Sequence, residues 1–316
     1  MADPDIGRPT AEFVRKRPAP PLRGFVADYI GYREAGVPPA RHRGLPSPYL
    51  TLIVTLDDPL VVDAHPDPLA TPGTYDTLVG GLHTTPALIS HDGRQSGVQL
   101  ALTPLGARAL LGVPAGELSG ADLDGTDVLG GAADELRERL LDATGWPERF
   151  AVLDTMFTRL SGSAPEPGAG PGRGRRPGSG TKTALPAEVA WAWRRLLETG
   201  GGLGVSDLAR EVGWSTRYLR RRFREEIGLG PKEAARVVRF DRARRTLQRQ
   251  AAAGSSATLA TLAASFGYYD QAHLAREFGA LAGCSPSRWL DEESQSFTAG
   301  SPTADRPTCR SPTALL

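Results

Sequence analysis

Two stretches of the chain repeat each other, VSDLAREVGWSTRYLRRRF at Val205–Phe223 and LATLAASFGYYDQAHLAREF at Leu259–Phe278. They match at an offset of 54 residues up to a central glycine, and at an offset of 55 beyond it. A repeat whose offset changes only within a turn indicates two copies of one supersecondary unit. The matched positions are Leu208, Ala209, Val212, Gly213, Leu219, Arg221, Phe223, Gly228 and Pro231 in the first copy, and Leu262, Ala263, Phe266, Gly267, Leu274, Arg276, Phe278, Gly283 and Pro286 in the second.

The first copy predicts a helix, a short turn at Gly213 and a second helix that begins after Ser215, a good N-cap residue. Leu219, Phe223 and Ile227 recur every four residues, so they share the buried side of that second helix. The arginines Arg217, Arg220, Arg221 and Arg224 point elsewhere. A packed helix with arginines on its exposed side suits the major groove of DNA. A helical hairpin with a solvated basic face is the alternative, and the second copy favours DNA binding over it.

The formal net charge of +1 conceals two regions of opposite sign. From Leu22 to Leu160 there are 10 Arg against 18 Asp and Glu, a balance of −8, whereas Pro186 to Asp291 has 17 Arg and Lys against 11 Asp and Glu, a balance of +6. An acidic part joined to a basic part suggests that only the latter binds nucleic acid. The scarcity of lysine among many alanines and glycines is typical of a GC-rich bacterial genome.

The acidic part contains β-favouring runs separated by turn residues, followed by helical patterns, which predicts an α+β domain with a small antiparallel sheet, sandwich or barrel. The strand candidates are Tyr49–Leu56, Pro59–Val62, Asp76–Val79 and Gly97–Leu102. The helix candidates begin at Thr103, Ala132 and Trp146. From Pro186 onwards the pattern is helical and predicts about seven helices, including a long basic helix from Pro231 to about Gln250 that joins the two copies.

The composition divides the chain into five parts. Residues 1–20, 162–184 and 292–316 are polar or rich in Gly, Pro and Ser, so they are expected to be a disordered leader, linker and tail. The domains lie between them, at 21–161 and 185–291. The two cysteines, Cys284 and Cys309, form no disulfide framework, and there is neither a signal sequence nor a membrane span, so a cytoplasmic location is expected.

The residues from about Val189 to Leu290 resemble the DNA-binding domain of the AraC/XylS family of bacterial transcription regulators. The resemblance rests on the repeated G…P terminators and on the A-R-x-x-L pattern in the helix that joins the copies. It implies two helix-turn-helix units whose recognition helices enter successive major grooves of promoter DNA, roughly 34 Å apart. The positions that match the DNA-contacting surface are Ser215, Thr216, Arg217, Arg220, Arg221, Arg224, Asp270, Gln271, His273 and Arg276.

In this family the domain that does not bind DNA, here the N-terminal one, often senses a small molecule or dimerises. A small-molecule effector, a second copy of the chain and RNA polymerase are therefore further candidate partners. Polar residues of the acidic domain are candidates to line an effector pocket, or are ordinary surface residues: Arg43, Tyr49, His83, His91, Arg94 and Gln99. The histidine spacing favours no metal site, and no cofactor is expected. An enzyme recruited to DNA is the alternative function, but no catalytic constellation supports it, and a methyl-accepting thiolate is excluded because no cysteine precedes Cys284.

Overall fold

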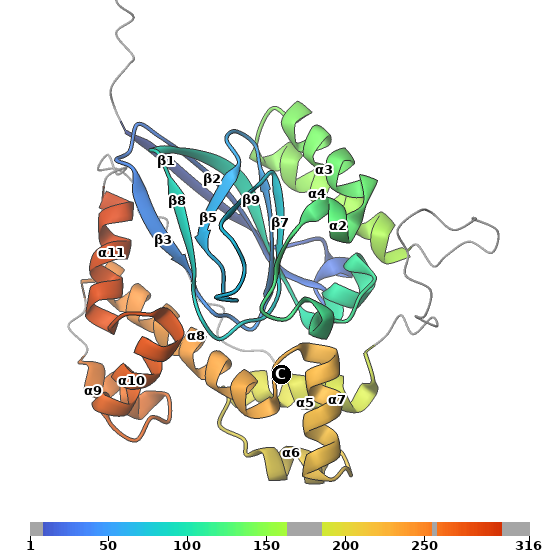
Figure 1. Ribbon diagram of the computed structural model, residues 1–316, viewed down its shortest axis with the longest axis vertical. Helices are drawn as coiled ribbons and strands as arrows, with labels where there is room; N and C mark the ends of the chain where they lie inside the picture. The colour runs from blue at the N-terminus through green and yellow to red at the C-terminus, as the bar shows by residue number, and fades with distance from the viewer. Residues whose placement is uncertain (1–8, 163–184, 255–257, 299–316) are drawn as a thin grey trace, which may run out of the picture.

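A computed structural model describes residues 9–162, 185–254 and 258–298 of the chain. Its N-terminal half is built from two antiparallel sheets and a group of helices, and its C-terminal half is helical (Figure 1). The predicted fold class, a β-rich α+β domain followed by an all-α double helix-turn-helix domain, is confirmed. The predicted linker, apart from its first residue, Gly162, lies outside the described residues.

The two sheets contain only antiparallel pairs. The first sheet has the order β1 (Thr10–Lys16), β2 (Val26–Ala35), β9 (Arg94–Leu102), β4 (Leu50–Thr55), β7 (Thr77–Gly80) and β10 (Asp122–Asp124). The second has the order β3 (Ala40–Gly44), β8 (Ala87–His91), β5 (Leu60–Ala64) and β6 (Gly73–Tyr75). The arrangement is therefore the sandwich-like one among the predicted alternatives.

Strand β4 explains why this half needs two apolar layers. Leu52 and Val54 face the main core, which the helices cover, whereas Ile53 faces a smaller cluster that includes Val62 and Ile89 of the second sheet. Successive side chains of a strand point to opposite faces, so a strand buried on both sides carries apolar side chains on both faces. The continuous run of β-favouring residues that predicted this strand has this physical cause.

Helices and helical turns follow the last long strand, as predicted. Thr103 caps the first of them, since its hydroxyl accepts a hydrogen bond from the backbone N–H of Gly106. The elements are α1 (Pro104–Gly106), the π-helical turn η2 (Ala107–Leu111), the 3-10 turn η3 (Ala115–Leu118), α2 (Gly125–Leu129), α3 (Gly131–Asp142) and α4 (Trp146–Gly162), and one further 3-10 turn, η1 (Pro20–Leu22), lies near the start of the chain. Helices α2, α3 and α4 lie together on one side of the sheets (Figure 1).

Two of the expected disordered segments contain regular structure. Within residues 1–20, Thr10–Lys16 forms the edge strand β1, which pairs with β2 along its whole length. The polar sequence of β1 gave no strand signal because this edge strand is held by backbone hydrogen bonds to β2 rather than by an alternating apolar face. At the other end, α11 (Pro286–Thr298) continues past Asp291 into the expected tail. The prediction of disorder was therefore wrong for residues 10–16 and 292–298.

The helical half contains the repeated units in the predicted order. Helices α6 (Val205–Glu211) and α7 (Thr216–Ile227) form the first unit, and α9 (Leu259–Ser265) and α10 (Gln271–Ala282) form the second. The long helix α8 (Pro231–Ala252) joins them, α5 (Ala187–Glu198) packs against the first unit, and α11 packs against the second. Both α7 and α10 end at a glycine with positive φ, Gly228 at 97° and Gly283 at 71°, which explains the repeated glycine of the sequence.

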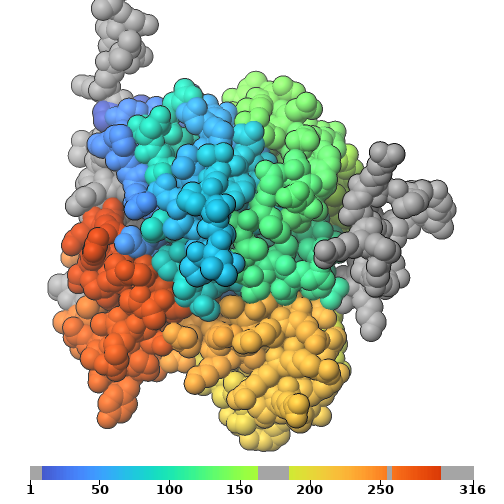
Figure 2. All heavy atoms as spheres, viewed as in Figure 1, coloured from blue at the N-terminus to red at the C-terminus, as the bar shows by residue number. Residues whose placement is uncertain are grey.

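The N-terminal half contacts both units, as the space-filling view shows (Figure 2). On the first unit, the Arg108 guanidinium donates to the nearly buried Glu226 carboxylate at 2.6 and 2.9 Å. On the second, Arg43 of β3 donates to Glu292 at 2.7 Å and to the carbonyl oxygen of Ala282 at 2.9 Å. These ion pairs join residues more than 100 positions apart, so the two halves pack as one body with polar contacts at both ends.

Candidate DNA interface and N-terminal pocket

The first unit holds its recognition helix, α7, by an apolar face and an N-terminal cap. Leu219, Phe223 and Ile227 are fully buried, and the Phe223 ring packs against Trp193 of α5 with 6.2 Å between ring centroids. The hydroxyl of Ser215 accepts a hydrogen bond from the backbone N–H of Tyr218 at 3.2 Å. This fixes the register of α7, so the side chains opposite its apolar face are directed to solvent.

An aromatic pair occupies the turn of the first unit and the first turn of α7. The rings of Trp214 and Tyr218 meet edge to face, with centroids 4.8 Å apart. The Arg221 guanidinium lies 5.2 Å from the centroid of the Tyr218 ring, a cation–π contact. Tyr218 is 41% exposed, so the pair supports the arginine from the side while leaving it open to solvent.

The second unit repeats this arrangement with different side chains. The Asp270 carboxylate caps α10 by accepting from the backbone N–H of His273 at 2.6 Å. The ring of Tyr268 meets the His273 ring edge to face at 5.4 Å, as Trp214 meets Tyr218. The extra residue of the second turn is Tyr269, which is 91% exposed and whose backbone N–H donates to Nδ1 of His273 at 3.2 Å. The slip in the offset was the sequence signal for this residue, although it was absent from the predicted contacts.

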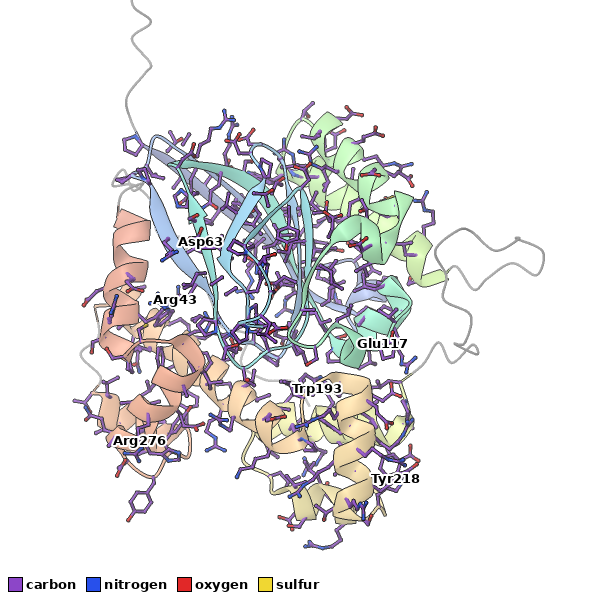
Figure 3. All side chains as sticks on the ribbon, viewed as in Figure 1. Arg43, Asp63, Glu117, Trp193, Tyr218 and Arg276 are labelled. Atoms are coloured by element: carbon purple, nitrogen blue, oxygen red, sulfur yellow. The ribbon has the colours of Figure 1, made fainter. Side chains whose placement is uncertain are left out.

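Both recognition helices present their exposed residues on the side of the molecule away from the sheets. Tyr218 of α7 and Arg276 of α10 lie at the lower edge of Figure 3, on two separate lobes, whereas Arg43 and Trp193 lie nearer the N-terminal half. The contacts with the N-terminal half involve Glu226 and Gly228 at the C-terminal end of α7, and Ala282 at the C-terminal end of α10. The N-terminal half therefore leaves the N-terminal turns of both helices uncovered.

The predicted DNA-contacting arginines differ in their protein partners. Arg217, Arg220 and Arg276 are exposed and form no hydrogen bond or ion pair with any residue in the described ranges. Arg221 lies 4.0 Å from Glu225, and Arg224 donates to Glu233 at the start of α8 at 2.7 Å. Thr216 is partly exposed and Gln271 exposed, while Ser215 and Asp270 use a side-chain oxygen as the cap. The structure thus places six of the ten predicted residues on α7 and its cap, and four on α10 and its cap.

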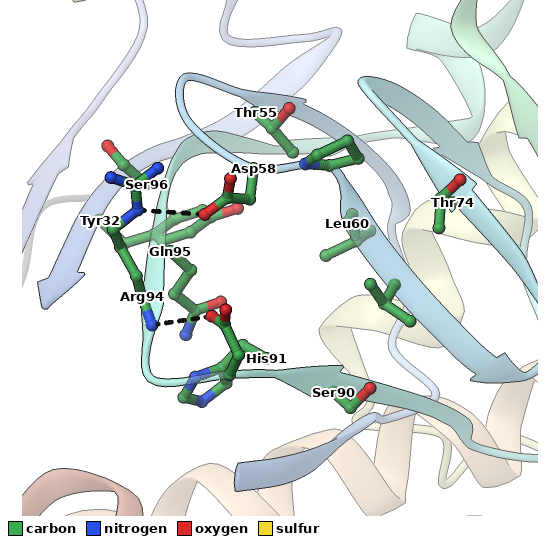
Figure 4. A pocket seen from close by; sticks show the side chains of 13 residues that line it. Tyr32, Thr55, Asp58, Leu60, Thr74, Ser90, His91, Arg94, Gln95 and Ser96 are labelled. Atoms are coloured by element: carbon green, nitrogen blue, oxygen red, sulfur yellow. Dashed lines mark hydrogen bonds and ion pairs between the residues drawn. The ribbon is translucent and has the colours of Figure 1, made fainter. Parts of the chain in front are cut away.

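A pocket of about 440 Å³ lies at one end of the sandwich, between the two sheets (Figure 4). Its wall combines apolar groups such as Leu60 with the charged groups of Asp58 and Arg94, which form an ion pair at 3.0 Å. Beside it, the nearly buried Glu34 accepts a hydrogen bond from the amide of Gln95 at 2.5 Å. The full lining is Tyr32, Thr55, Asp58, Pro59, Leu60, Val61, Thr74, Ser90, His91, Asp92, Arg94, Gln95 and Ser96.

Only two of the six residues predicted to line a pocket, His91 and Arg94, line this one. Arg43 and Tyr49 instead face the helical half, where the Arg245 guanidinium lies 5.9 Å from the centroid of the Tyr49 ring. His83 Nδ1 lies 2.5 Å from the carbonyl oxygen of Thr85, and Gln99 lies in the middle of β9, away from the pocket.

His42 lies beside the pocket residue His91, with 6.2 Å between their ring centroids. Burial, with a smaller effect of the neighbouring His91, lowers the pKa of His42 to about 4. Within the described part of the chain, no three His, Cys, Asp or Glu side chains gather as ligands of one ion.

No helix among the described residues is long and apolar enough to span a membrane.

Two capped helical hairpins with uncovered recognition helices define a protein of the helix-turn-helix, DNA-binding class. Residues 208–292 match the family model described as a helix-turn-helix domain, and residues 14–124 match a model described as a domain of unknown function. The chain therefore carries a helix-turn-helix domain of the AraC type in its C-terminal half. The resemblance stated from the sequence is thereby confirmed.

Solved structures similar to this chain include two that match about a third of it and one that matches most of it. The C-terminal domain of AraT, a response regulator from Geobacillus stearothermophilus, is 20% identical over 34% of this chain and 86% of its own, with a TM-score of 0.30. An AraC-type regulator from Chromobacterium violaceum is 22% identical over 34% and 93%, with a TM-score of 0.30. ToxT from Vibrio cholerae O395 is 9% identical over 90% and 97%, with a TM-score of 0.43. The search of curated proteins gave no match.

Proposed function

We propose that this chain regulates transcription by placing α7 and α10 in successive major grooves on one face of promoter DNA. The observation that carries the proposal is that both helices direct their uncovered N-terminal turns away from the N-terminal half (Figure 3). Successive major grooves on one face of B-DNA repeat every helical turn, roughly 34 Å, and α8 connects the two units as one continuous helix.

The side chains on the two helices divide into base-contacting and phosphate-contacting groups. Arg217 and Arg220 have no carboxylate partner among the described residues, so their guanidinium groups are available to guanine O6 and N7. On α10, Gln271 suits the edge of adenine, and Arg276 suits guanine or phosphate. Arg224 keeps donors beyond those used by Glu233, and from its position in the last turn of α7 it meets phosphate, which fixes register without selecting sequence.

The test is selection of binding sites from random duplexes by the full chain, followed by gel-shift titration of the selected site. A selected site with two half-sites about 10 base pairs apart supports the proposal. Arg217→Ala should then cost roughly 1–3 kcal/mol on that site and relax its preference at one base pair. Arg210→Ala, an exposed arginine of α6 paired with Asp207, is the matched control. The absence of any selected sequence would refute the proposal.

A second proposal concerns the N-terminal pocket, which we infer to bind a small effector between the two sheets. Its support is a hollow of about 440 Å³ with mixed apolar and charged walls, within the size range of ligand sites. A ligand that binds only the folded state raises apparent stability by RT ln(1 + [L]/Kd), so a thermal-shift screen of the full chain against metabolites tests it. Leu60→Trp, which fills the pocket, should abolish the shift, whereas Arg43→Ala, outside the pocket, should retain it.

The alternative of an enzyme recruited to DNA has weaker support. The matched helix-turn-helix model covers residues 208–292 and supports DNA binding, and the model matched by residues 14–124 names no activity. The pocket carboxylates Asp58 and Asp92 are engaged with the guanidinium and the backbone N–H of Arg94, respectively. We therefore propose that the chain regulates transcription by binding DNA. A second copy of the chain and RNA polymerase are further proposed partners.

A further inference from the structure

The two units carry different aromatic side chains at one equivalent position on the recognition helices. Tyr218 of α7 and His273 of α10 are both the third helical residue, and both donate a backbone N–H to the capping side chain. Both also meet an aromatic ring of the turn edge to face, at 4.8 and 5.4 Å. Only the second unit has an additional turn residue, Tyr269, beside this position.

The additional residue fixes the chemistry of His273. The backbone N–H of Tyr269 donates to Nδ1 at 3.2 Å, so Nδ1 is the acceptor nitrogen of the ring. A neutral imidazole carries one proton, which must then reside on Nε2. Nε2 forms no hydrogen bond with any residue that the structure describes, and His273 is partly exposed. The ring therefore offers a single N–H donor on its outer edge.

The ring is also held in place on its other sides. Tyr268, only 5% exposed, packs edge to face against it, and the Arg239 guanidinium lies 5.5 Å from the centroid of the Tyr268 ring. Burial raises the pKa of the Tyr268 hydroxyl to about 12, so this neighbour stays an uncharged phenol. A side chain held in one position and one tautomer can discriminate between bases, because it loses little conformational freedom on binding.

We propose that His273 is a specificity-determining residue that donates from Nε2 to the acceptor edge of a purine, N7 or guanine O6, with its tautomer fixed by the Tyr269 backbone. In the major groove these atoms accept hydrogen bonds, whereas adenine N6 and cytosine N4 donate them. A donor-only ring therefore selects against a cytosine or an adenine amino group in its path. The inference rests on the proposed DNA-binding function and assigns the second unit a chemical preference of its own.

The first test is the tautomer in the full chain without DNA. Nitrogen-15 NMR distinguishes Nδ1–H from Nε2–H histidine, and His273→Gln identifies the signal. The neutral Nε2–H form is expected. A predominant Nδ1–H form would overturn the proposal whatever the protein does to DNA.

The second test uses the site selected by the wild-type chain. His273→Ala should flatten the preference at one base pair and weaken binding about three- to tenfold, the effect of one hydrogen bond. His273→Gln, whose amide reaches the Nε2 position, should retain part of the preference, and His273→Asn, which is shorter, should not. Tyr269→Ala keeps the backbone donor and is the matched control with an unchanged base preference.

Modified bases identify the acceptor atom. If the acceptor is N7, a 7-deazapurine at the identified base pair should weaken DNA binding by the wild-type chain and leave binding by His273→Ala unchanged. If the acceptor is O6, replacing guanine by 2-aminopurine should have the same two effects. Equal weakening of all sequences by His273→Ala would mark a phosphate contact and overturn the proposal, as would an unchanged preference. Failure of the wild-type chain to select any sequence would instead refute the proposed function, so the two failures are distinguishable.

Discussion

The two helix-turn-helix units share a framework and differ in what they present on it. In each, a leucine and a phenylalanine of the recognition helix are buried, a polar side chain caps the helix, and a ring of the turn meets the third helical residue. On α7 this residue is Tyr218, which lies beneath the Arg221 guanidinium, whereas on α10 it is His273, hydrogen-bonded to the turn. The same backbone can therefore carry two chemically different surfaces.

The units also differ in their attachment to the N-terminal half. Glu226 of the first unit is 5% exposed and accepts from Arg108 and from Arg222, and the Ser119 hydroxyl donates to the carbonyl oxygen of Gly228 at 2.8 Å. The second unit is held through Arg43, whose partner Glu292 is about one-third exposed. Since solvent screens an exposed ion pair, the first attachment should be the stronger one.

The largest expected effect tests whether the framework is truly shared. Leu219→Ala and Leu274→Ala each remove a buried side chain, at 0% and 1% exposure, and each should lower the free energy of unfolding of its unit by about 2–5 kcal/mol. Hydrogen exchange of the amides in α7 and α10 reports the two units separately. Costs that differ by more than about 2 kcal/mol would mean that the two units are not equivalent frameworks.

The next effect tests the unequal attachment. Glu226→Gln removes the charge that Arg108 contacts and should lower the free energy of unfolding by about 1–3 kcal/mol, as a buried charged hydrogen bond does. The neighbouring Glu225→Gln, an exposed carboxylate on the same helix, is the control and should stay within about 0.5 kcal/mol. Denaturant titration of the full chain measures the free energy of unfolding of the wild-type chain and of both variants.

The second attachment supplies the contrast. Glu292→Gln alters a partly exposed pair and should cost less than about 1 kcal/mol. A cost equal to or greater than that of Glu226→Gln would reverse the order of the two attachments.

Sequence patterns predicted what depends on local chemistry. The buried leucines of α7 and α10, the cap Ser215 and the turn glycine each leave a signal within a few residues, whereas Asp270, predicted only as a DNA contact, proved to be the cap of α10. The repeat then made that signal specific to the double helix-turn-helix fold. Tyr269 was detectable as the slip in the offset, but its bond to His273 became apparent only when the backbone was placed.

Contacts between distant segments had no comparable signal. Strand β1 is polar, and only its pairing with β2 makes it a strand. Arg108 and Glu226 are separated by 118 residues, and nothing around either indicates the other. The pocket likewise forms where the ends of β5, β8 and β9 meet. Of the polar residues that the sequence suggested as its lining, only His91 and Arg94 therefore lie in it.

The smallest expected effect concerns the salt dependence of DNA binding, where the surfaces of the two units should differ most clearly. Each phosphate neutralised by an arginine steepens the fall of log K with log salt concentration by about 1. Arg221→Ala should therefore flatten this slope by about 1 if Arg221 contacts phosphate, since its guanidinium is exposed beside Tyr218. His273→Ala should change the slope by nearly 0, because a neutral donor releases no counterion. Gel-shift titrations of the selected site at several salt concentrations measure both slopes, with Arg210→Ala as the exposed control. A larger change for His273→Ala than for Arg221→Ala would show that the second unit, rather than the first, supplies the electrostatic part of the affinity.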